Sequence, residues 1–296
     1  PVVSSAASDV YKRQGLAKSA VAYKVDETQY DLSDQLKDKA QVSIITIQSE
    51  EGLEIMRHTL TAQVLARAIK NLYPKSKLAI GPTIEDGFYY DVESEEVISS
   101  DDLIKIEDEM KNIIKTKSLL TKKLVSKSEA LKIFKEKKEP FKETIINESN
   151  QKNDFQLYYQ ENEEFVDLCR GPHLPNLGFI GSFKLTKVSG AYWKGDSKNT
   201  MLTRIYGTAF NSDKDLQKHL NEVEEALKRD HRKLGREMDL FHFQDEAPGM
   251  VFWHYKGWTV YRQLRNFVRN KLQDNNYIEV NTCLLYTSDA ADDTTG

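Results

Sequence analysis

Cysteine is scarce in this sequence, with 2 residues among 296. Two cysteines cannot build a disulfide framework, so a reducing, cytoplasmic compartment is expected. Long uncharged apolar runs are also lacking, which argues against a membrane-spanning helix and against a membrane partner. Positive charge is not in excess, because the formal net charge is -4. This excludes a globally basic nucleic-acid binder but leaves room for a local basic patch.

Charged residues are plentiful and make up 30% of the chain, against 39% hydrophobic residues. This balance is typical of a globular protein with a well-charged surface. A chain of this length has room for two domains and part of a third.

The two ends of the chain differ from the rest. Residues 4–14, SSAASDVYKRQ, and residues 283–292, CLLYTSDAAD, resemble translations of one transposon-end sequencing adapter read in opposite orientations. We therefore expect a non-native leader over residues 1–14 and a non-native tail over residues 283–296. The natural sequence would then enter near Gly15 and stop near Thr282, as an internal fragment of a longer protein.

Alternating and β-branched stretches predict strands, and apolar residues at spacings of three and four predict helices. Strands are expected over residues 21–25, 42–47, 157–159, 164–168, 179–189, 201–210 and 277–280, with a strand–turn–strand unit over 77–92. Helices are expected over residues 50–73, 100–117, 126–138, 213–236 and 258–272. Pro74 ends the first helix, and the polar stretch from Lys142 to Lys152 predicts a loop.

The stretch from Phe165 to Asp196 holds the residues with the most chemistry. Cys169 and His173 flank Arg170-Gly171-Pro172, whose residue types favour a sharp turn. Such a turn would bring a thiol and an imidazole to one rim, as metal sites and hydrolytic sites require.

Two further features have a plain structural alternative. His58 lies near the apolar stripe of the first predicted helix, and a lone helical histidine is most often a surface or packed imidazole. Lysines outnumber acids between Lys105 and Lys142. That stretch predicts either a solvated helix face or a patch that contacts phosphate, and the residues alone favour the solvated face.

Seven blocks of sequence, in order, closely resemble the N-terminal half of bacterial-type threonyl-tRNA synthetases. They are GLEIMRH at 52–58, KLAIGPTIEDGFYYDV at 77–92, VDLCRGPHLPN at 166–176, GAYWKGDS at 190–197, LTRIYGTAF at 202–210, KRDHRKLGREMDLFHF at 228–243 and EAPGMVFWH at 246–254. The resemblance covers residues 15–282, and its long ungapped blocks make it specific.

The resemblance implies an α+β fold in several parts. Residues 15–48 would be the C-terminal half of a TGS domain, a small β-grasp module. Residues 49–211 would form a two-lobed α+β editing domain of the threonyl/alanyl type, and residues 212–240 a long linker helix. Residues 241–282 would be the first helix and strand of a class II antiparallel-sheet catalytic domain, with part of motif 1. The family has a proline just after that strand where this chain has Cys283, which fits the adapter prediction.

The resemblance also implies a function. The parent enzyme would attach threonine to tRNA(Thr) with ATP, and this fragment would carry the editing domain that hydrolyses mischarged Ser-tRNA(Thr). Serine differs from threonine by one missing methyl group, which lets a synthetic site discriminate between them by only about 1–3 kcal/mol. A second, hydrolytic site is therefore needed. Two alternatives stay open. One is a hydrolytically inactive module that binds the tRNA acceptor end, and the other is a free-standing trans-editing metallohydrolase of the alanyl type.

Carried over by motif, the resemblance implies two groups of site residues. The catalytic positions would be His58, Cys169, His173, Lys142 and Asp167, with Lys142 on the terminal adenosine and Asp167 on the amino or hydroxyl group of serine. The substrate-binding positions would be Tyr90, Gln63, Arg170, Gly190, Tyr192, Trp193 and Asp196.

The first helix departs from the family's His-x-x-x-His motif. Counting forward from His58 puts Ala62 at the second histidine position, whereas counting back from Ala68 puts Thr59 and Gln63 at the pair. One extra residue lies between these anchors, and the second histidine is missing in either count. Editing is therefore expected to be weakened, since Gln63 can orient a water but cannot take its proton.

Cofactor and partner expectations follow from the same comparison. No metal is expected, because a tetrahedral site would lack a ligand; the candidates, if any, would be His58, Cys169 and His173. ATP, magnesium and zinc would belong to the remainder of the parent's catalytic domain. The expected partner is the acceptor end of tRNA(Thr), with the amino acid arriving only as the tRNA ester. The parent is expected to be a homodimer, since motif 1 builds the class II dimer interface.

Overall fold

The computed structural model describes residues 15–35, 41–160 and 165–280. It divides into two compact units, residues 1–219 and 220–296, and helices and antiparallel sheets are mixed along the chain. The α+β class is therefore confirmed. The adapter-like ends predicted over 1–14 and 283–296 lie outside the described residues.

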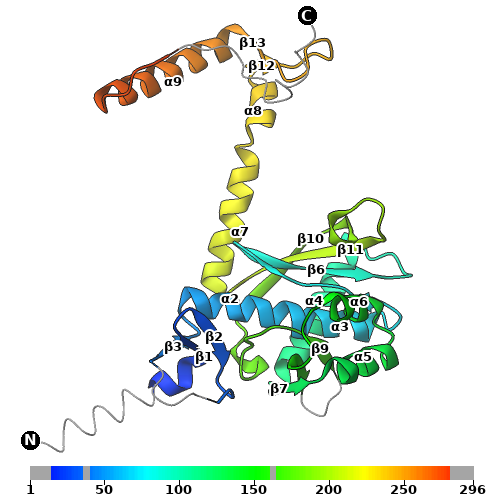
Figure 1. The fold of residues 1–296 in the computed structure, drawn as a ribbon. Coiled ribbons are helices and arrows are strands. Elements are labelled where there is room, and N and C mark those ends of the chain that lie inside the picture. Colours follow the sequence, from blue (N-terminus) through cyan, green and yellow to red (C-terminus); the bar gives the residue numbers. More distant parts are fainter. Residues whose placement is uncertain (1–14, 36–40, 161–164, 281–296) are drawn as a thin grey trace, which may run out of the picture. The chain divides into compact units, whose positions relative to one another are not determined.

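A small antiparallel sheet opens the first unit (Figure 1). Its strands, in the order β2-β1-β3, are β1 (Ala20–Val25), β2 (Thr28–Asp31) and β3 (Val42–Thr46). Val21, Ala22 and Ile45 are buried in the same core as the helices that follow. Asp31, the last residue of β2, is buried although it is charged.

The helix predicted over residues 50–73 is present, but its winding changes midway. It consists of α2 (Glu50–Thr59), the π-helix η1 (Leu60–Leu65) and α3 (Ala66–Leu72). Ser49 caps its start by accepting from the Gly52 N–H, and two glutamates in the first turn favour the positive end of the helix dipole.

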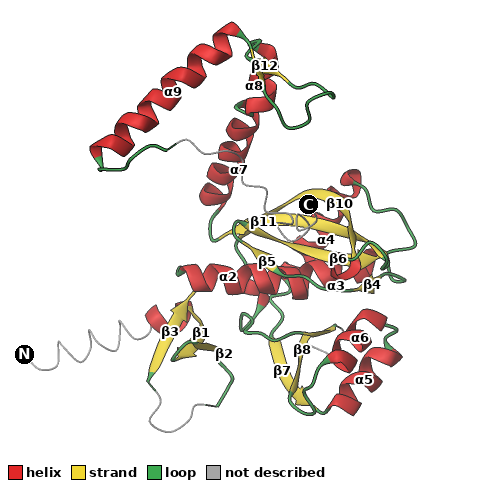
Figure 2. Cartoon of the chain, turned by 45° about the horizontal axis from the view of Figure 1, so that its top comes forward, coloured by secondary structure: helices red, strands yellow, loops and turns green. Residues whose placement is uncertain are grey.

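These helices and α4 pack on an antiparallel sheet to form what we call the first lobe (Figure 2). The sheet order is β10-β11-β6-β4, with β5 paired to β6. The elements are β4 (Lys77–Leu78), β5 (Thr83–Ile84), β6 (Gly87–Glu93), η2 (Ser100–Asp102), α4 (Leu103–Lys115), η4 (Leu177–Phe179), β10 (Ser182–Tyr192), η5 (Trp193–Gly195) and β11 (Met201–Phe210). Alternation along β6 buries Phe88, Tyr90 and Val92 in this core.

A second lobe has its own sheet and its own core. The sheet, in the order β7-β8-β9, consists of β7 (Leu120–Val125), β8 (Phe155–Gln160) and β9 (Val166–Leu168). The helices α5 (Lys127–Glu136) and α6 (Pro140–Glu148) cover one face of it. A capping box begins α5, with Ser126 and Glu129 bonding each other's backbone N–H groups.

The predicted loop from Lys142 to Lys152 is wrong over its first half, because α6 occupies residues 140–148. Pro140 stands at the first helical position, where its fixed φ and missing N–H fit. Phe141, Lys142 and Ile146 are buried, and the exposed polar residues of the helix are Asn147 and Glu148 at its end.

The single long helix predicted over residues 213–236 is also wrong. The chain forms α7 (Asp213–Lys228) and α8 (His231–Glu237), and Asp230 interrupts them by accepting from the Arg232 N–H at 2.7 Å. Aspartate is a strong N-cap, so it begins a new helix here rather than continuing the old one.

The second unit contains a short hairpin that the sequence pattern did not predict, and a long helix that it did. The hairpin pairs β12 (Phe241–His242) with β13 (Phe252–Trp253), and α9 spans Tyr255–Asp274. The strand predicted over residues 277–280 is not formed, and this segment has no ladder partner among the described residues.

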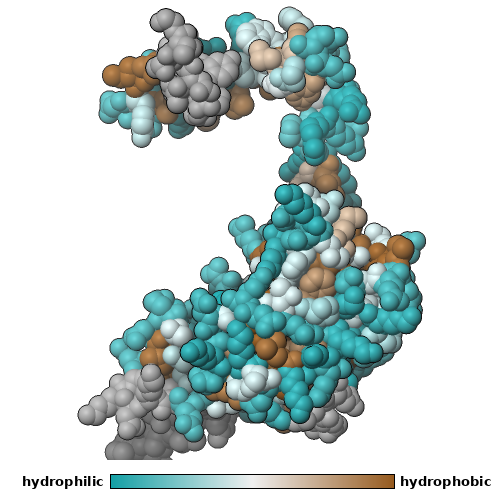
Figure 3. Space-filling view, turned by 45° about the vertical axis from the view of Figure 1, so that its right-hand side comes forward, coloured by the Kyte–Doolittle hydropathy of each residue, from teal (hydrophilic) through white to brown (hydrophobic). Residues whose placement is uncertain are grey.

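The surface agrees with the composition. On the face shown in Figure 3, most of the first unit is hydrophilic and its apolar patches are small and separate. No helix in the described part of the chain is both long and apolar enough to cross a membrane.

Candidate functional site

Alternation along β8 and β9 creates a polar face opposite the core of the second lobe. Leu157 and Val166 turn toward α5 and α6. Tyr158 and Asp167, which pair across the two strands, therefore turn to the other side together. Cys169 follows two residues after Asp167, and its thiol meets His58 of α2. The candidate site thus lies where this polar face meets the helix formed by α2, η1 and α3.

A tight turn carries the chain from Cys169 to His173. Gly171 adopts a left-handed backbone with φ of 66°. A Cβ at this position would lie 2.0 Å from the hydroxyl oxygen of Tyr158. Only glycine meets both requirements, because it tolerates positive φ and leaves this space free.

The turn brings Cys169, His58 and His173 into one group, which we call the thiol–imidazole trio. The Nε2 atom of His58 lies 2.8 Å from the Sγ atom of Cys169. The two imidazole rings stack, with centroids 4.7 Å apart and an interplanar angle of 8°. The expected meeting of thiol and imidazole at one rim is confirmed, and His58 is a member of it rather than an isolated helical histidine.

The hydrogen bonds of Thr59 define the tautomer of His173. The Thr59 hydroxyl lies 2.8 Å from the Ile55 carbonyl oxygen and 3.0 Å from Nδ1 of His173. It has one proton, which goes to the carbonyl because that oxygen can only accept. His173 must then donate its Nδ1–H to Thr59. Its Nε2 atom keeps a lone pair, and this buried atom makes no hydrogen bond of ordinary geometry among the described residues. The Cys169 thiol nevertheless lies close enough to oppose the lowering of the His173 pKa by burial.

We expect Thr59→Val to abolish this tautomer preference, because valine keeps the shape but cannot accept a proton. The His173 Nδ1–H and the Leu174 N–H, which also bonds Thr59 at 3.0 Å, would both lose their acceptor. The cost to folding is about 1–3 kcal/mol. Ring ¹⁵N–¹H correlation spectra of histidine-labelled protein should show mixed or Nε2-protonated His173.

Thr61→Val is the matched control for this prediction. Thr61 is equally buried and its hydroxyl donates to the Arg57 carbonyl oxygen, one turn back along the helix. This variant should leave the His173 ring signals unchanged. An unaltered His173 tautomer in Thr59→Val would show that the assignment is incorrect.

Burial keeps both imidazoles of the trio neutral. Desolvation lowers the pKa of His173 and also that of His58, despite the opposing effect of nearby acids. A neutral imidazole with a free lone pair can accept a proton, as a general base must.

A buried ion pair stands beside the trio. Lys142 Nζ and Asp167 Oδ1 lie 2.6 Å apart, with side chains 4% and 3% exposed. The Tyr90 hydroxyl lies 3.4 Å from Asp167 Oδ2, and burial together with the Asp167 charge raises the pKa of Tyr90 well above its usual value. Asp167 Oδ1 also accepts from the Leu168 N–H at 2.8 Å. The Oδ2 atom thus retains accepting capacity for a ligand.

Three pockets reach this group of residues, and the one that His173 lines, of about 290 Å³, is also lined by Asp31 and Tyr158. A second, of about 360 Å³, is lined by Lys142 and Asp167 and by three further cations, Arg67, Lys70 and Lys137. The third, of about 200 Å³, is lined by His58, Glu54, Gly171 and Pro172 among others. Two acids also line the second pocket, and they pair with two of its cations, Glu139 with Lys70 and Asp167 with Lys142. The lining of the second pocket keeps a net positive charge, which suits a phosphate-bearing ligand.

The π-helix accounts for the extra residue in the first helix. The N–H of Ala66 bonds the carbonyl of Thr61, five residues back rather than four. The alignment with the family motif that starts from His58 is therefore correct for residues before the π-helix, and the alignment that starts from Ala68 is correct for residues after it. Such π-turns recur at functional sites.

Gln63, at the altered position, is fully buried. Its backbone oxygen accepts from Gln160 Nε2 at 2.5 Å, and its own Oε1 lies 3.4 Å from the same atom. The Nε2 atom of Gln63 is buried without a hydrogen-bond partner among the described residues. The side chain is thus directed toward the end of β8.

The remaining predicted substrate-binding residues lie in different surroundings. Arg170 is exposed at the start of the tight turn. Trp193 is buried against Phe141, with ring centroids 4.9 Å apart, and so packs on the residue next to Lys142. Gly190 and Tyr192 belong to the end of β10, and Asp196 accepts from the Lys198 N–H within its own turn. Their substrate contacts stay predictions.

The trio does not fit a zinc ion held by His58 and Cys169 together. Two ligand atoms on a tetrahedral zinc would be about 3.5 Å apart, given the usual Zn–S and Zn–N bond lengths. Here they are in direct hydrogen-bond contact at 2.8 Å. The three side chains form the one group of metal-ligating type found among the described residues, with ligand atoms within 4.8 Å of one another. We derive no step through a metal.

Sequence reasoning missed three residues that hold the site together, Thr59, Tyr158 and Asp31. The sequence singled out Thr59 only as one of two residues that could occupy the first histidine position of the family motif. Tyr158 and Asp31 are ordinary strand residues by pattern, and their roles arise from contacts across more than 100 residues of chain: the Tyr158 hydroxyl donates to Asp31 at 2.6 Å.

Comparison with known proteins finds similar sequences along most of the chain. Residues 156–206 match the family described as the threonyl and alanyl tRNA synthetase second additional domain. The threonine–tRNA ligase of Prochlorococcus marinus (strain MIT 9211) is 48% identical over 280 residues, which cover 95% of this chain and 43% of the relative. That of Bartonella tribocorum is 51% identical over 269 residues, or 90% and 40%. That of Brucella melitensis biotype 2 is 51% identical over 270 residues, or 91% and 41%.

The chain spans about two fifths of the length of the curated relatives that it matches. The matched family domain includes β8, β9, the tight turn with Cys169 and His173, and most of β10 and β11. The blocks on which the resemblance was based lie within the aligned length. On this evidence the chain belongs to the threonyl-tRNA synthetase family.

Proposed function

We propose that the first unit hydrolyses the ester bond of Ser-tRNA(Thr), and that the chain is part of a protein that attaches threonine to tRNA(Thr). The observation that carries the hydrolytic proposal is the free Nε2 lone pair of a neutral His173 beside Cys169 and His58. The relatives, which are named threonine–tRNA ligases, provide the substrate class.

In this proposal each polar group has one task. The Nε2 atom of His173 takes a proton as water attacks the ester carbonyl. The carbonyl carbon then releases the ribose oxygen, which takes the proton back from the His173 imidazolium, and serine and tRNA separate. Asp167 Oδ2 binds the ammonium group of the amino acid, and the cations around Lys142 hold the phosphates of the acceptor end. No metal takes part.

The compartment, oligomeric state and cofactors of the parent protein are inferred from the family alone. We infer a cytoplasmic protein whose parent is a homodimer and whose ATP, magnesium and zinc sites lie beyond the two lobes. The tRNA contact made by this chain is proposed to be the acceptor end.

Serine release from Ser-tRNA(Thr) tests the function, with Thr-tRNA(Thr) as the comparison. The 296-residue chain should release serine faster than buffer does, and faster than it releases threonine. Equal, uncatalysed release from both esters with retained tRNA binding would instead support the inactive acceptor-end module. Loss of serine release on chelation would support the metallohydrolase alternative.

Gln63→His is expected to accelerate serine release by about 10²-fold, the low end of what a positioned general base contributes. The reason is that an imidazole can accept a proton and an amide cannot. Because Gln63 is fully buried and directed toward Gln160, the gain also requires the new ring to turn toward the substrate water. Initial deacylation rates measure the effect. Ala62→His is the matched variant in the other count, and a gain there alone would place the missing histidine at residue 62. No gain in either variant, together with a wild-type rate equal to that of a relative with both histidines, would refute weakened editing.

A further inference from the structure

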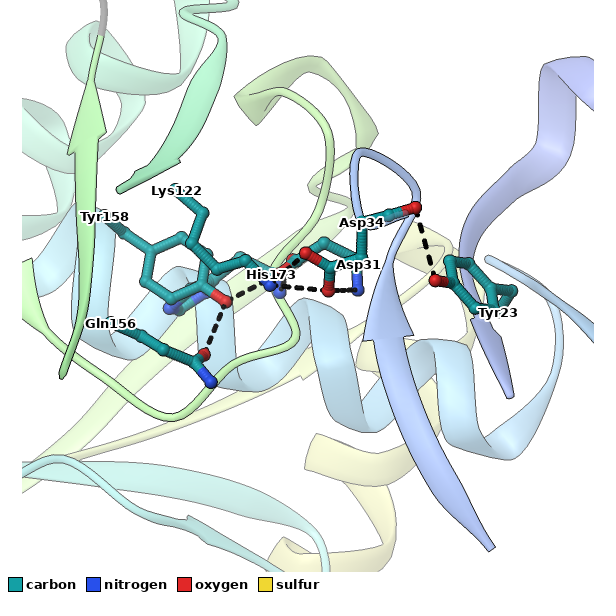
Figure 4. A network of polar contacts seen from close by, with 7 residues as sticks. All are labelled: Tyr23, Asp31, Asp34, Lys122, Gln156, Tyr158 and His173. Carbon is teal, nitrogen blue, oxygen red and sulfur yellow. Dashed lines mark hydrogen bonds and ion pairs between the residues drawn. The ribbon is translucent and has the colours of Figure 1, made fainter. Parts of the chain in front are cut away.

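A carboxylate from the small N-terminal sheet reaches the candidate site (Figure 4). Asp31 Oδ1 accepts from the backbone N–H of His173 at 2.8 Å. Asp31 Oδ2 accepts from the Tyr158 hydroxyl at 2.6 Å and lies 2.9 Å from Lys122 Nζ. Asp31 is 6% exposed, so these contacts replace water rather than compete with it.

The turn around His173 offers few other ways to hold its backbone. Pro172 has no N–H, and the N–H of Leu174 is already bonded to Thr59. The His173 N–H would be an unsatisfied buried donor without Asp31. The same carboxylate holds Tyr158, whose ring meets the His173 ring edge-on with centroids 4.3 Å apart at 77°.

Asp31 is itself fixed in place by its neighbours. Its backbone N–H donates to Asp34 Oδ2 at 3.1 Å, and Lys122 from β7 pairs with both acids. The Tyr23 hydroxyl bonds the Asp34 carbonyl oxygen at 3.3 Å. The end of β2 is therefore held firmly in place, and its Asp31 hydrogen-bonds the His173 backbone.

We propose that Asp31 is a positioning residue for the hydrolytic site. The small N-terminal sheet then contributes a residue on which the geometry of that site depends. Asp31 places the His173 backbone directly and its ring through Tyr158. The inference rests on the proposed function for its catalytic consequence, but the placement of His173 can be measured without any substrate.

Asp31→Ala should lower kcat for serine release by about 10- to 100-fold with little change in KM, because an error of about 1 Å in a catalytic group costs that much. Asp31→Asn should recover most of the rate. Its amide oxygen can still accept from the His173 N–H, and the Tyr158 hydroxyl can donate to Gln156 Oε1, now 3.3 Å away. Glu107→Ala is the control. Glu107 is 5% exposed and accepts from the Leu185 N–H at 2.9 Å, so this variant also removes a buried carboxylate that holds a backbone N–H. Its hydrogen bonds go to Lys184 and Leu185 rather than to His173.

The second readout is the His173 backbone amide in ¹⁵N-histidine-labelled protein, which has 6 histidines. In the wild type, Asp31→Asn and Glu107→Ala, this amide should be shifted downfield and protected from exchange. In Asp31→Ala it should lose both properties while the thermal midpoint shows that the chain is folded.

Three results would overturn the inference. The His173 amide of Asp31→Ala could match the wild type, the rate could fall only with the folded fraction, or Glu107→Ala could reproduce every effect of Asp31→Ala. If the wild type releases no serine, the proposed function fails, and the amide alone then decides whether Asp31 positions His173.

Discussion

Replacing His173 by alanine is expected to slow serine release from Ser-tRNA(Thr) by about 10²- to 10⁴-fold, the range attributed to a positioned general base. His173 is 2% exposed, its Nδ1–H is committed to Thr59, and its Nε2 atom is the unpaired proton acceptor of the site. Removing the ring leaves the Cys169 thiol and the His58 imidazole, which already share a hydrogen bond. Single-turnover deacylation measures the effect directly.

The control for His173→Ala is His231→Ala, which changes an exposed histidine at the start of α8. Its rate of serine release should equal that of the wild type. Because the alanine at 173 leaves a buried space, near-ultraviolet circular dichroism should accompany the assay to show that both variants are folded. A folded His173→Ala that retains the wild-type rate would remove His173 from the mechanism.

Asp167→Ala is expected to lower the free energy of unfolding by about 3–5 kcal/mol, the usual cost of leaving one partner of a buried ion pair uncompensated. Lys142 would remain 4% exposed with its main counter-charge gone, and the Tyr90 hydroxyl would lose its nearest acceptor. Urea denaturation, followed by a signal from the first unit, measures this loss.

Two variants separate charge imbalance from loss of packing. Glu148→Ala breaks the Lys194–Glu148 pair, whose side chains are 43% and 56% exposed, and should cost at most about 1 kcal/mol. The double variant Lys142→Met/Asp167→Leu should recover much of the stability lost in Asp167→Ala, because apolar side chains of similar size often replace a buried pair at little cost. A double variant as unstable as Asp167→Ala would mean that packing, not charge, dominates. Neither Lys142 nor Asp167 should be replaceable without loss of serine release.

Local patterns predicted most of the secondary structure because hydrophobic periodicity reports which face of an element is buried. Two such patterns are the alternation around Tyr90 in β6 and the apolar stripe along the helix formed by α2, η1 and α3. The same reasoning failed at α6 and at Asp230. At α6 the solvent-facing polar residues masked the buried Phe141 and Ile146, and at Asp230 a capping interaction outweighed helical continuity.

The sequence by itself determined the pieces of the candidate site. The turn-forming Arg170-Gly171-Pro172 places Cys169 close to His173, and the family resemblance singles out His58, Lys142 and Asp167. The comparison with the family motif also showed that the first helix has one extra residue and lacks the second histidine.

Only the tertiary structure decided how those pieces act together. It absorbs the extra residue in a π-turn, gives His173 its tautomer through Thr59, 114 residues away, and bonds its backbone to Asp31, 142 residues away. The physical reason is that such hydrogen bonds depend on where packed elements place their donors and acceptors. Periodicity along the chain carries information about burial of each element, but not about which polar group of a distant element will lie within 3 Å of it.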